Sequence, residues 1–137
     1  MSLVIVADEN IALLDEIESQ WGTVTRLPGR DIKADDLREA DMLLVRSVTP
    51  VNADLLTDTP VRFVGTATIG EDHIDRDYLR SNGIAYASAP GCNARAVVDY
   101  VTAALFNQFS DSELQAIQIG IAGYGNVGRA LVARLAH

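Results

Sequence analysis

Three glycines near the C-terminal end of the chain have the spacing that binds a dinucleotide. Residues 123–128 read Gly-Tyr-Gly-Asn-Val-Gly, directly after an apolar stretch and before a helical pattern whose apolar positions share one face. The string G-x-G-x-x-G alone is a weak signal, but the order strand, turn, helix is the context that the dinucleotide fingerprint requires. In that context Gly123 permits the tight turn, Gly125 allows close approach of a pyrophosphate, and Gly128 allows the helix to pack on the strand. The competing interpretation is a turn that needs glycines only for its geometry.

The backbone N–H groups of Gly125, Asn126 and Val127 would face the phosphates from a helix N-terminus, which suits an anion. The acidic residue that contacts the adenosine ribose is expected about 20 residues further on. The chain ends at His137, before that position. These residues therefore predict a dinucleotide without deciding between NAD and NADP.

A second group of candidate residues follows the expected strands, where loops of a parallel sheet gather ligands. Ser47 and Thr68 offer hydroxyls, and Arg46 can donate two parallel hydrogen bonds to a carboxylate or phosphate. Serine and threonine more often cap helices and turns than bind ligands, and Arg46 has the alternative of pairing with Asp8 or Glu9. Because the loops should leave the sheet at a common edge, we expect Ser47, Thr68 and Arg46 to bind a small anionic substrate.

Other reactive residue types fit structural roles better. His73 stands at an expected helix start, where an exposed or capping position is favoured over catalysis. Cys92 has no basic partner nearby in the sequence, so a packing or loop role is expected. No spacing of His, Cys and Asp resembles a metal site.

The elements that must position these residues are short apolar runs alternating with helical patterns. Their nearly continuous apolar character predicts strands covered on both faces, as in a parallel sheet. The chain is therefore expected to be α/β, with a flavodoxin-like doubly wound parallel sheet followed by the first βα unit of a Rossmann domain. The expected strands are Leu3–Ala7, Thr23–Leu27, Asp41–Val45, Val61–Gly65, Ile84–Ser88 and Ala116–Ala122.

Capping residues indicate where the helices begin and end. Asp72 followed by Asp75, before Tyr78-Leu79, predicts a capped helix start, and Asn82-Gly83 predicts its end. The apolar stripes of residues 93–109 predict a helix that is buried on several sides, joins two domains and faces a partner subunit. We expect residues 1–92 to be part of a substrate-binding domain, 93–112 an interdomain helix and linker, and 113–137 the truncated start of an NAD-binding Rossmann domain.

Composition excludes several classes of protein. The 137 residues carry a formal net charge of -8 with Lys33 as the single lysine, which disfavours nucleic acid as a partner. No apolar run approaches the roughly 18–20 residues that span a bilayer, and no secretion leader opens the chain. A single cysteine fits a reducing cytoplasm.

The chain resembles the D-2-hydroxyacid dehydrogenase family over essentially its whole length. The glycine turn is shared across that family, whereas three other strings are typical of the branch that acts on 4-phospho-D-erythronate. These strings are Arg-Ser-Val-Thr at 46–49, Gly-Thr-Ala-Thr at 65–68 and Pro-Gly-Cys-Asn-Ala at 90–94.

The resemblance implies oxidation of a small phosphorylated 2-hydroxy acid with NAD, in pyridoxal 5'-phosphate biosynthesis, by a homodimer whose nucleotide domain is inserted into the substrate domain. It makes Ser47 and Thr68 substrate contacts and Asn126-Val127 dinucleotide contacts. It also places the family's catalytic Arg, Glu and His beyond His137, so that this chain holds no catalytic residue and is expected to be inactive alone.

Three alternatives stay open. One is a related enzyme acting on glycerate or lactate, and another is a catalytically silent NAD-sensing protein. The third, a signalling receiver, needs an Asp after the third strand and a Lys after the fifth, where this chain has Arg46-Ser47 and Ala89-Pro90.

Overall fold

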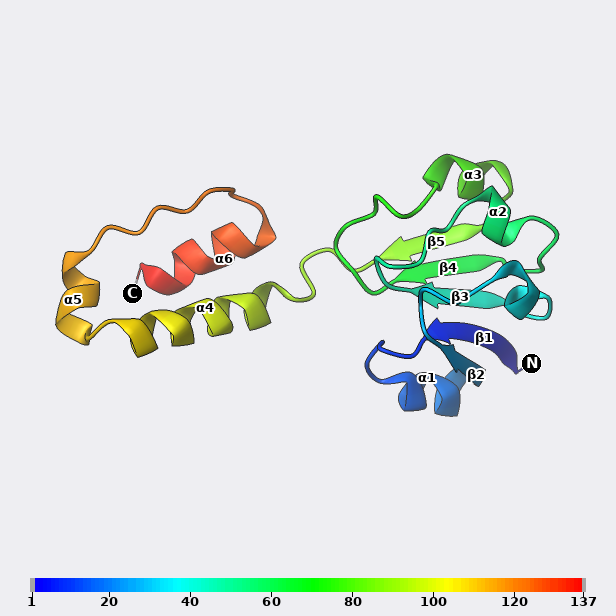
Figure 1. Ribbon diagram of the computed structural model, residues 1–137, viewed down its shortest axis with the longest axis horizontal. Coiled ribbons are helices and arrows are strands. Elements are labelled where there is room, and N and C mark those ends of the chain that lie inside the picture. The colour runs from blue at the N-terminus through cyan, green and yellow to red at the C-terminus, as the bar shows by residue number, and fades with distance from the viewer. Residues whose placement is uncertain (1, 137) are drawn as a thin grey trace. The chain divides into compact units, whose positions relative to one another are not determined.

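The computed structural model describes residues 2–136, which form two compact units. The first unit ends at Ala89 and the second begins at Pro90. The sheet labelled in Figure 1 lies in the first unit, and three helices, α4 to α6, lie in the second.

The first unit contains a five-stranded parallel sheet with the order β2-β1-β3-β4-β5. This order is the flavodoxin-like one, so the predicted fold class is confirmed. The expected strands of this unit are all present, with ends shifted by one or two residues. They are β1 (Leu3–Asp8), β2 (Gly22–Leu27), β3 (Met42–Val45), β4 (Phe63–Thr66) and β5 (Ala85–Ser88).

Helices lie on both faces of the sheet, but the expected burial on both faces is found for β1 and not for β5, whose Ala85 and Ala87 are exposed. Val6, Leu43 and Val64 belong to one apolar cluster, which also takes buried residues from the 3₁₀ helix η1 (Ala34–Leu37), α2 (Ala53–Leu56) and α3 (Arg76–Ser81). Ile5 and Ala7 belong to a second cluster with Leu14 of α1 (Leu14–Trp21). Successive strand side chains point to opposite faces, so neighbouring residues of β1 enter different clusters.

Polar contacts at the helix ends agree with the predicted signals. The carboxylate of Asp75 accepts from the backbone N–H of Tyr78 at 2.9 Å, and α3 ends at Ser81, before Asn82 and Gly83. The backbone φ of Gly83 is 68°, a left-handed conformation that favours glycine. The predicted helix and both of its ends are confirmed.

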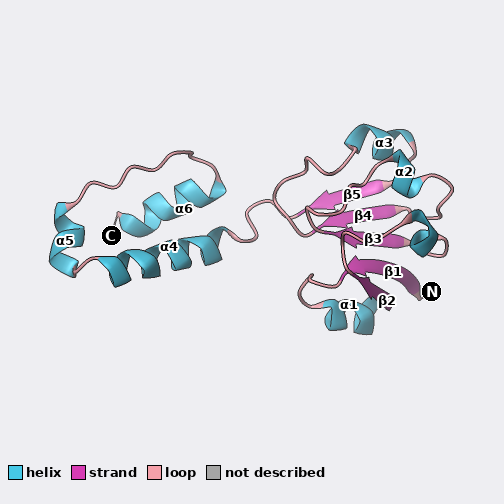
Figure 2. Ribbon diagram, in the orientation of Figure 1, coloured by secondary structure: helices cyan, strands magenta, loops and turns pink. Residues whose placement is uncertain are grey.

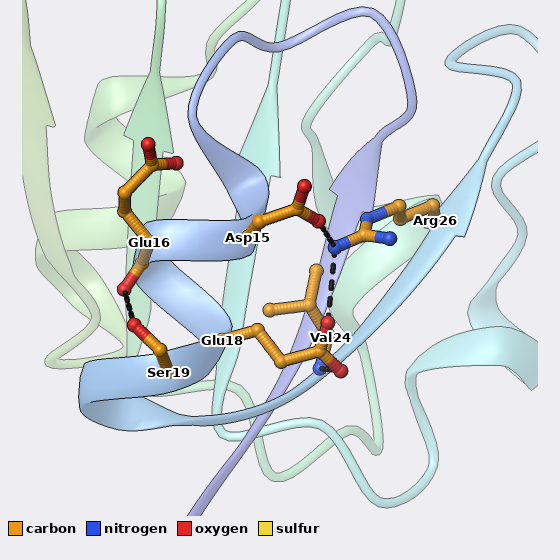
Figure 3. A network of polar contacts seen from close by, with 6 residues as sticks. All are labelled: Asp15, Glu16, Glu18, Ser19, Val24 and Arg26. Atoms are coloured by element: carbon orange, nitrogen blue, oxygen red, sulfur yellow. Dashed lines mark hydrogen bonds and ion pairs between the residues drawn. The ribbon is translucent and has the colours of Figure 1, made fainter.

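An exposed ion-pair network joins α1 to β2 (Figure 3). A terminal nitrogen of Arg26 lies 2.6 Å from Asp15 and 2.9 Å from Glu18. Because these groups are hydrated, each pair contributes only about 0.2–1 kcal/mol. The network orients α1 on the sheet without dominating its stability.

The second unit consists of α4 (Ala94–Gln108), α5 (Asp111–Ala116) and α6 (Asn126–Leu135). An ion pair between Asp99 and Arg134 joins α4 to α6, which lie side by side (Figure 1). The predicted helix 93–109 is confirmed, but burial on several sides is not found among the described residues. Val98 is its buried residue, whereas Tyr100 is 76% and Phe106 60% exposed.

The expected strand Ala116–Ala122 is wrong as secondary structure. Ala116 ends α5, and residues 117–124 connect it to α6 without a strand, drawn as a loop in Figure 2. A strand exists through hydrogen bonds to a neighbouring strand. The described part of the second unit contains no other strand, so this apolar stretch has no ladder to join.

Candidate functional site

Ser47 and Thr68 leave the sheet at the same edge. They follow β3 and β4, which are adjacent parallel strands with Val45 opposite Thr66 in the register. The N–H of Ala67 donates to the carbonyl of Val45 at 2.9 Å, which ties the loop after β4 to the end of β3. Ser47 is exposed and Thr68 half-buried, so both residues are accessible to solvent at this edge.

Thr68 is the end of a short chain of hydrogen-bonded side chains. Its hydroxyl lies 2.9 Å from that of Thr66, which in turn lies 3.1 Å from Nε2 of His73. Desolvation lowers the pKa of His73 below the usual 6.5, against the opposing influence of Asp72 and Glu71, so the neutral ring is favoured. The sequence predicted an exposed or capping role for His73. Its contact with Thr66 was missed because their pairing depends on a turn of the loop after β4.

Arg46 pairs with Asp8, one of the two acidic residues that the sequence offered as its partner. Its Nε lies 3.4 Å from Oδ2 of Asp8, and the Asp8 side chain is only 1% exposed against 37% for Arg46. Both residues line a cleft of about 320 Å³ at the ends of β1, β2 and β3. The other lining residues are Asn10, Pro28, Gly29, Arg30, Asp31 and Val48.

A second polar cluster lies beyond the end of β4 and beside β5. Glu71 pairs with Arg76 at 2.9 Å, and the Arg76 guanidinium lies 5.6 Å from the ring centre of Tyr86. The neighbouring Ser88 hydroxyl is the main cause that lowers the pKa of Glu71; burial opposes it, and the positive charge of Arg76 lowers the pKa further. No sequence signal pointed to this cluster, because its members come from separate elements.

In the second unit, the glycine turn has the geometry that its spacing predicted. Gly123 has a φ of 100°, in the left-handed region, and α6 begins directly after Gly125. A Cβ on Gly128 would lie 3.1 Å from the carbonyl carbon of Gly123 and even closer to its oxygen, so the helix packs directly on the turn. A Cβ on Gly125 would meet no described atom within 4 Å.

These positions fit a dinucleotide diphosphate. The open space at Gly125 lets an oxyanion reach the backbone, and the first N–H groups of a helix lack partners within it. Gly91 also lies close to this turn, since a Cβ there would be 3.2 Å from the amide nitrogen of Asn126. Asn126 and Val127 are the first two residues of α6, directly after the open position at Gly125.

Residues 2–136 contain neither a metal-binding cluster of side chains nor a helix that could span a membrane. No group of three or more His, Cys, Asp and Glu side chains could hold a metal ion there. None of the helices in that range combines the length and the hydropathy needed to cross a membrane.

Known proteins resemble the chain in sequence. The family model described as "D-isomer specific 2-hydroxyacid dehydrogenase, catalytic domain" matches residues 3–116. The erythronate-4-phosphate dehydrogenase of Salinibacter ruber is 53% identical over 136 residues, which are 98% of this chain and 35% of that protein. That of Cellvibrio japonicus is 56% identical over 131 residues, which are 96% of this chain and 34% of the relative. The chain thus spans about a third of the length of these curated relatives.

Solved structures resemble the chain in fold. An NAD-bound 3-phosphoglycerate dehydrogenase of Entamoeba histolytica superimposes with a TM-score of 0.71 at 16% identity, over 99% of this chain and 51% of that one. A D-lactate dehydrogenase of Aquifex aeolicus, complexed with NAD and lactic acid, gives 0.66 at 17% identity over 97% and 48%. Identities this low support the fold alone, which is the one expected from the sequence.

Proposed function

Because the chain belongs to the D-isomer specific 2-hydroxyacid dehydrogenase family, we propose that the full-length protein oxidises 4-phospho-D-erythronate to 3-hydroxy-2-oxo-4-phosphooxybutanoate. This reaction would serve pyridoxal 5'-phosphate (vitamin B6) biosynthesis. The observation that carries the proposal is 53–56% identity to two erythronate-4-phosphate dehydrogenases over nearly the whole chain. A glycerate- or lactate-type enzyme is the alternative within the same family.

The substrate would bind at the carboxyl edge of the sheet. There Ser47 and Thr68 donate or accept hydrogen bonds, and the guanidinium of Arg46 supplies a positive charge for a carboxylate or phosphate. The substrate carries both groups. A few local donors at this edge are enough to bind it, although the chain as a whole is strongly acidic.

The turn at Gly123, Gly125 and Gly128 would hold the diphosphate of NAD, with backbone N–H groups of Asn126 and Val127 as donors. NAD accepts the hydride from the substrate carbon whose hydroxyl becomes a ketone. Residues outside this chain would take the hydroxyl proton, so we expect residues 1–137 to show no dehydrogenase activity by themselves. We expect the full-length protein to be a cytoplasmic homodimer without nucleic-acid or membrane partners.

A substrate panel on the full-length protein tests the assignment. NADH formation is measured with 4-phospho-D-erythronate, D-glycerate and D-lactate, and kcat/KM should be highest for the phosphorylated acid. A clear preference for an unphosphorylated acid would overturn the erythronate assignment and favour the glycerate or lactate alternative.

Two variants test the proposed substrate contacts. Ser47→Ala and Thr68→Ala should each raise KM for the phosphorylated acid roughly tenfold, the equivalent of about 1.4 kcal/mol. Ser19→Ala is the matched control, because its hydroxyl donates to the carbonyl of Glu16 within α1, away from the proposed substrate site (Figure 3). Unchanged KM values in both site variants would remove Ser47 and Thr68 from the substrate site.

A further inference from the structure

A carboxylate is fully buried at the end of β1. The Asp8 side chain is only 1% exposed, and its Oδ1 accepts from the backbone N–H of Asn10 at 2.9 Å and from the Asn10 side-chain amide at 3.3 Å. Its Oδ2 has no hydrogen bond among residues 2–136. An ionised carboxylate costs several kcal/mol to bury unless an opposite charge lies close by. The nearest such charge is Arg46, whose Nε lies 3.4 Å from that oxygen.

The ion pair is asymmetric, because only one partner reaches the solvent. The Arg46 side chain keeps 37% of its surface exposed and lines the cleft of about 320 Å³. Nε is the atom that faces Asp8, and the two terminal nitrogens of Arg46 make no hydrogen bond within the described residues. A guanidinium anchored through Nε still has terminal N–H groups to offer an oxyanion.

Loops from two other strands hold this pair in place. Gly29, after β2, lies against the carboxylate so closely that a Cβ would be 2.9 Å from Cγ of Asp8. The buried hydroxyl of Thr49, after β3, donates to the carbonyl of Gly29 at 2.7 Å. The carboxylate is therefore confined by β1, β2 and β3 together, which gives the Arg46 guanidinium a fixed support.

We propose that Asp8 is a positioning residue, which orients Arg46 so that its terminal nitrogens bind an oxyanion group of the substrate in this cleft. Asp8 itself does not touch the substrate. The proposal rests on the proposed function, in which Arg46 belongs to the substrate site. This role accounts for the buried Asp8 carboxylate at the edge of the sheet, where an apolar side chain would cost less free energy to bury.

A double-mutant cycle on the full-length protein tests this role. Asp8→Asn keeps the shape but removes the charge, and it should raise KM for 4-phospho-D-erythronate about tenfold while kcat and KM for NAD change less than threefold. Arg46→Gln should raise KM at least as much. Because Asp8 acts through Arg46, adding Asp8→Asn to Arg46→Gln should cause little further change.

The matched control is Asp15→Asn, which makes the same change of charge in the exposed pair between Asp15 of α1 and Arg26 of β2 (Figure 3). All kinetic constants of this control should equal those of the wild type. If the KM effects of Asp8→Asn and Arg46→Gln multiply, or if Asp8→Asn leaves KM unchanged, the positioning role is refuted. The proposed function would still stand in that case, because the substrate panel and the Ser47 and Thr68 variants test it separately.

Two further measurements test the proposal in case Asp8→Asn does not fold, and show which substrate group Arg46 binds. Should Asp8→Asn fail to fold, Arg46→Lys retains the charge without the planar fork, and a wild-type KM for it would overturn the proposal. A KM increase confined to the phosphorylated acid would mean that Arg46 binds the phosphate. An equal increase with unphosphorylated D-erythronate would mean that it binds the carboxylate.

Discussion

Two glycines of the turn can be tested separately, because alanine at position 128 should lower stability whereas alanine at position 125 should lower the affinity for NAD. Gly128→Ala gains up to about 1 kcal/mol of helix propensity. The new Cβ, however, would be closer to the Gly123 carbonyl oxygen than the 3.0 Å below which real Cβ atoms are essentially never found. Backbone cannot rotate away as a side chain does, and overpacking of this kind costs roughly 1–3 kcal/mol. We expect a net loss of stability of about 1–2 kcal/mol.

Gly125→Ala should instead spare the fold. Its φ of -81° is accessible to alanine, and its Cβ would meet no described atom within 4 Å. Exchanging glycine for alanine at this N-cap costs on the order of 0.5–1 kcal/mol. The methyl group would occupy the space through which the diphosphate approaches, so the affinity for NAD should fall about 10- to 100-fold, or roughly 1.4–2.8 kcal/mol.

Thermal unfolding and calorimetric titration with NAD, both on the full-length protein, separate the two effects. In the absence of NAD, Gly128→Ala should lower Tm more than Gly125→Ala does, whereas Gly125→Ala should bind NAD weakly. Wild-type affinity for NAD in Gly125→Ala would refute the dinucleotide interpretation of the turn. A wild-type Tm in Gly128→Ala would refute the packing argument.

Three other predictions concern stability, measured by urea unfolding. Thr49→Val should cost roughly 1–3 kcal/mol, because the buried carbonyl of Gly29 loses its donor; a neutral effect would show that water replaces it. Asp75→Ala should cost about 1 kcal/mol by removing the N-cap of α3, and an unchanged midpoint would contradict that. Burial lowers the pKa of His73 below 6.5, so the unfolded chain takes up a proton at higher pH than the folded one. Stability should therefore be full above about pH 6.5 and fall as the pH drops further, and His73→Asn should flatten this decline; an identical profile in the variant would rule His73 out as its source.

The alternation of apolar runs and helical patterns was sufficient to predict the five strands of the first unit, but not its short helices η1 and α2. Each of the five apolar runs up to Ser88 became a strand of the parallel sheet. Their connection by helices brings Ser47 and Thr68 to one edge, because parallel strands all end on the same side. The conformations of Gly123 and Gly128 also followed from their spacing, since each has a local steric cause.

Side-chain pairing between distant elements could not be predicted in this way. Arg46 had both Asp8 and Glu9 within reach of its loop, and only the packed sheet shows that Asp8 faces it while Glu9 is exposed. His73 and Thr66 are seven residues apart, and their contact depends on the turn of the loop between them. Which side chains pair depends on how the loops pack in three dimensions, and this packing produces no periodic pattern in the sequence.

The sequence by itself predicted the five strands of the first unit, the type of its sheet and the edge at which the candidate ligand-binding residues gather, because apolar runs and turn residues are local signals. Tertiary structure alone decided which charges pair, which hydroxyls bond and whether an apolar run becomes a strand. The run at 117–122 has strand composition and is still not a strand, because its hydrogen-bond partners must come from another segment.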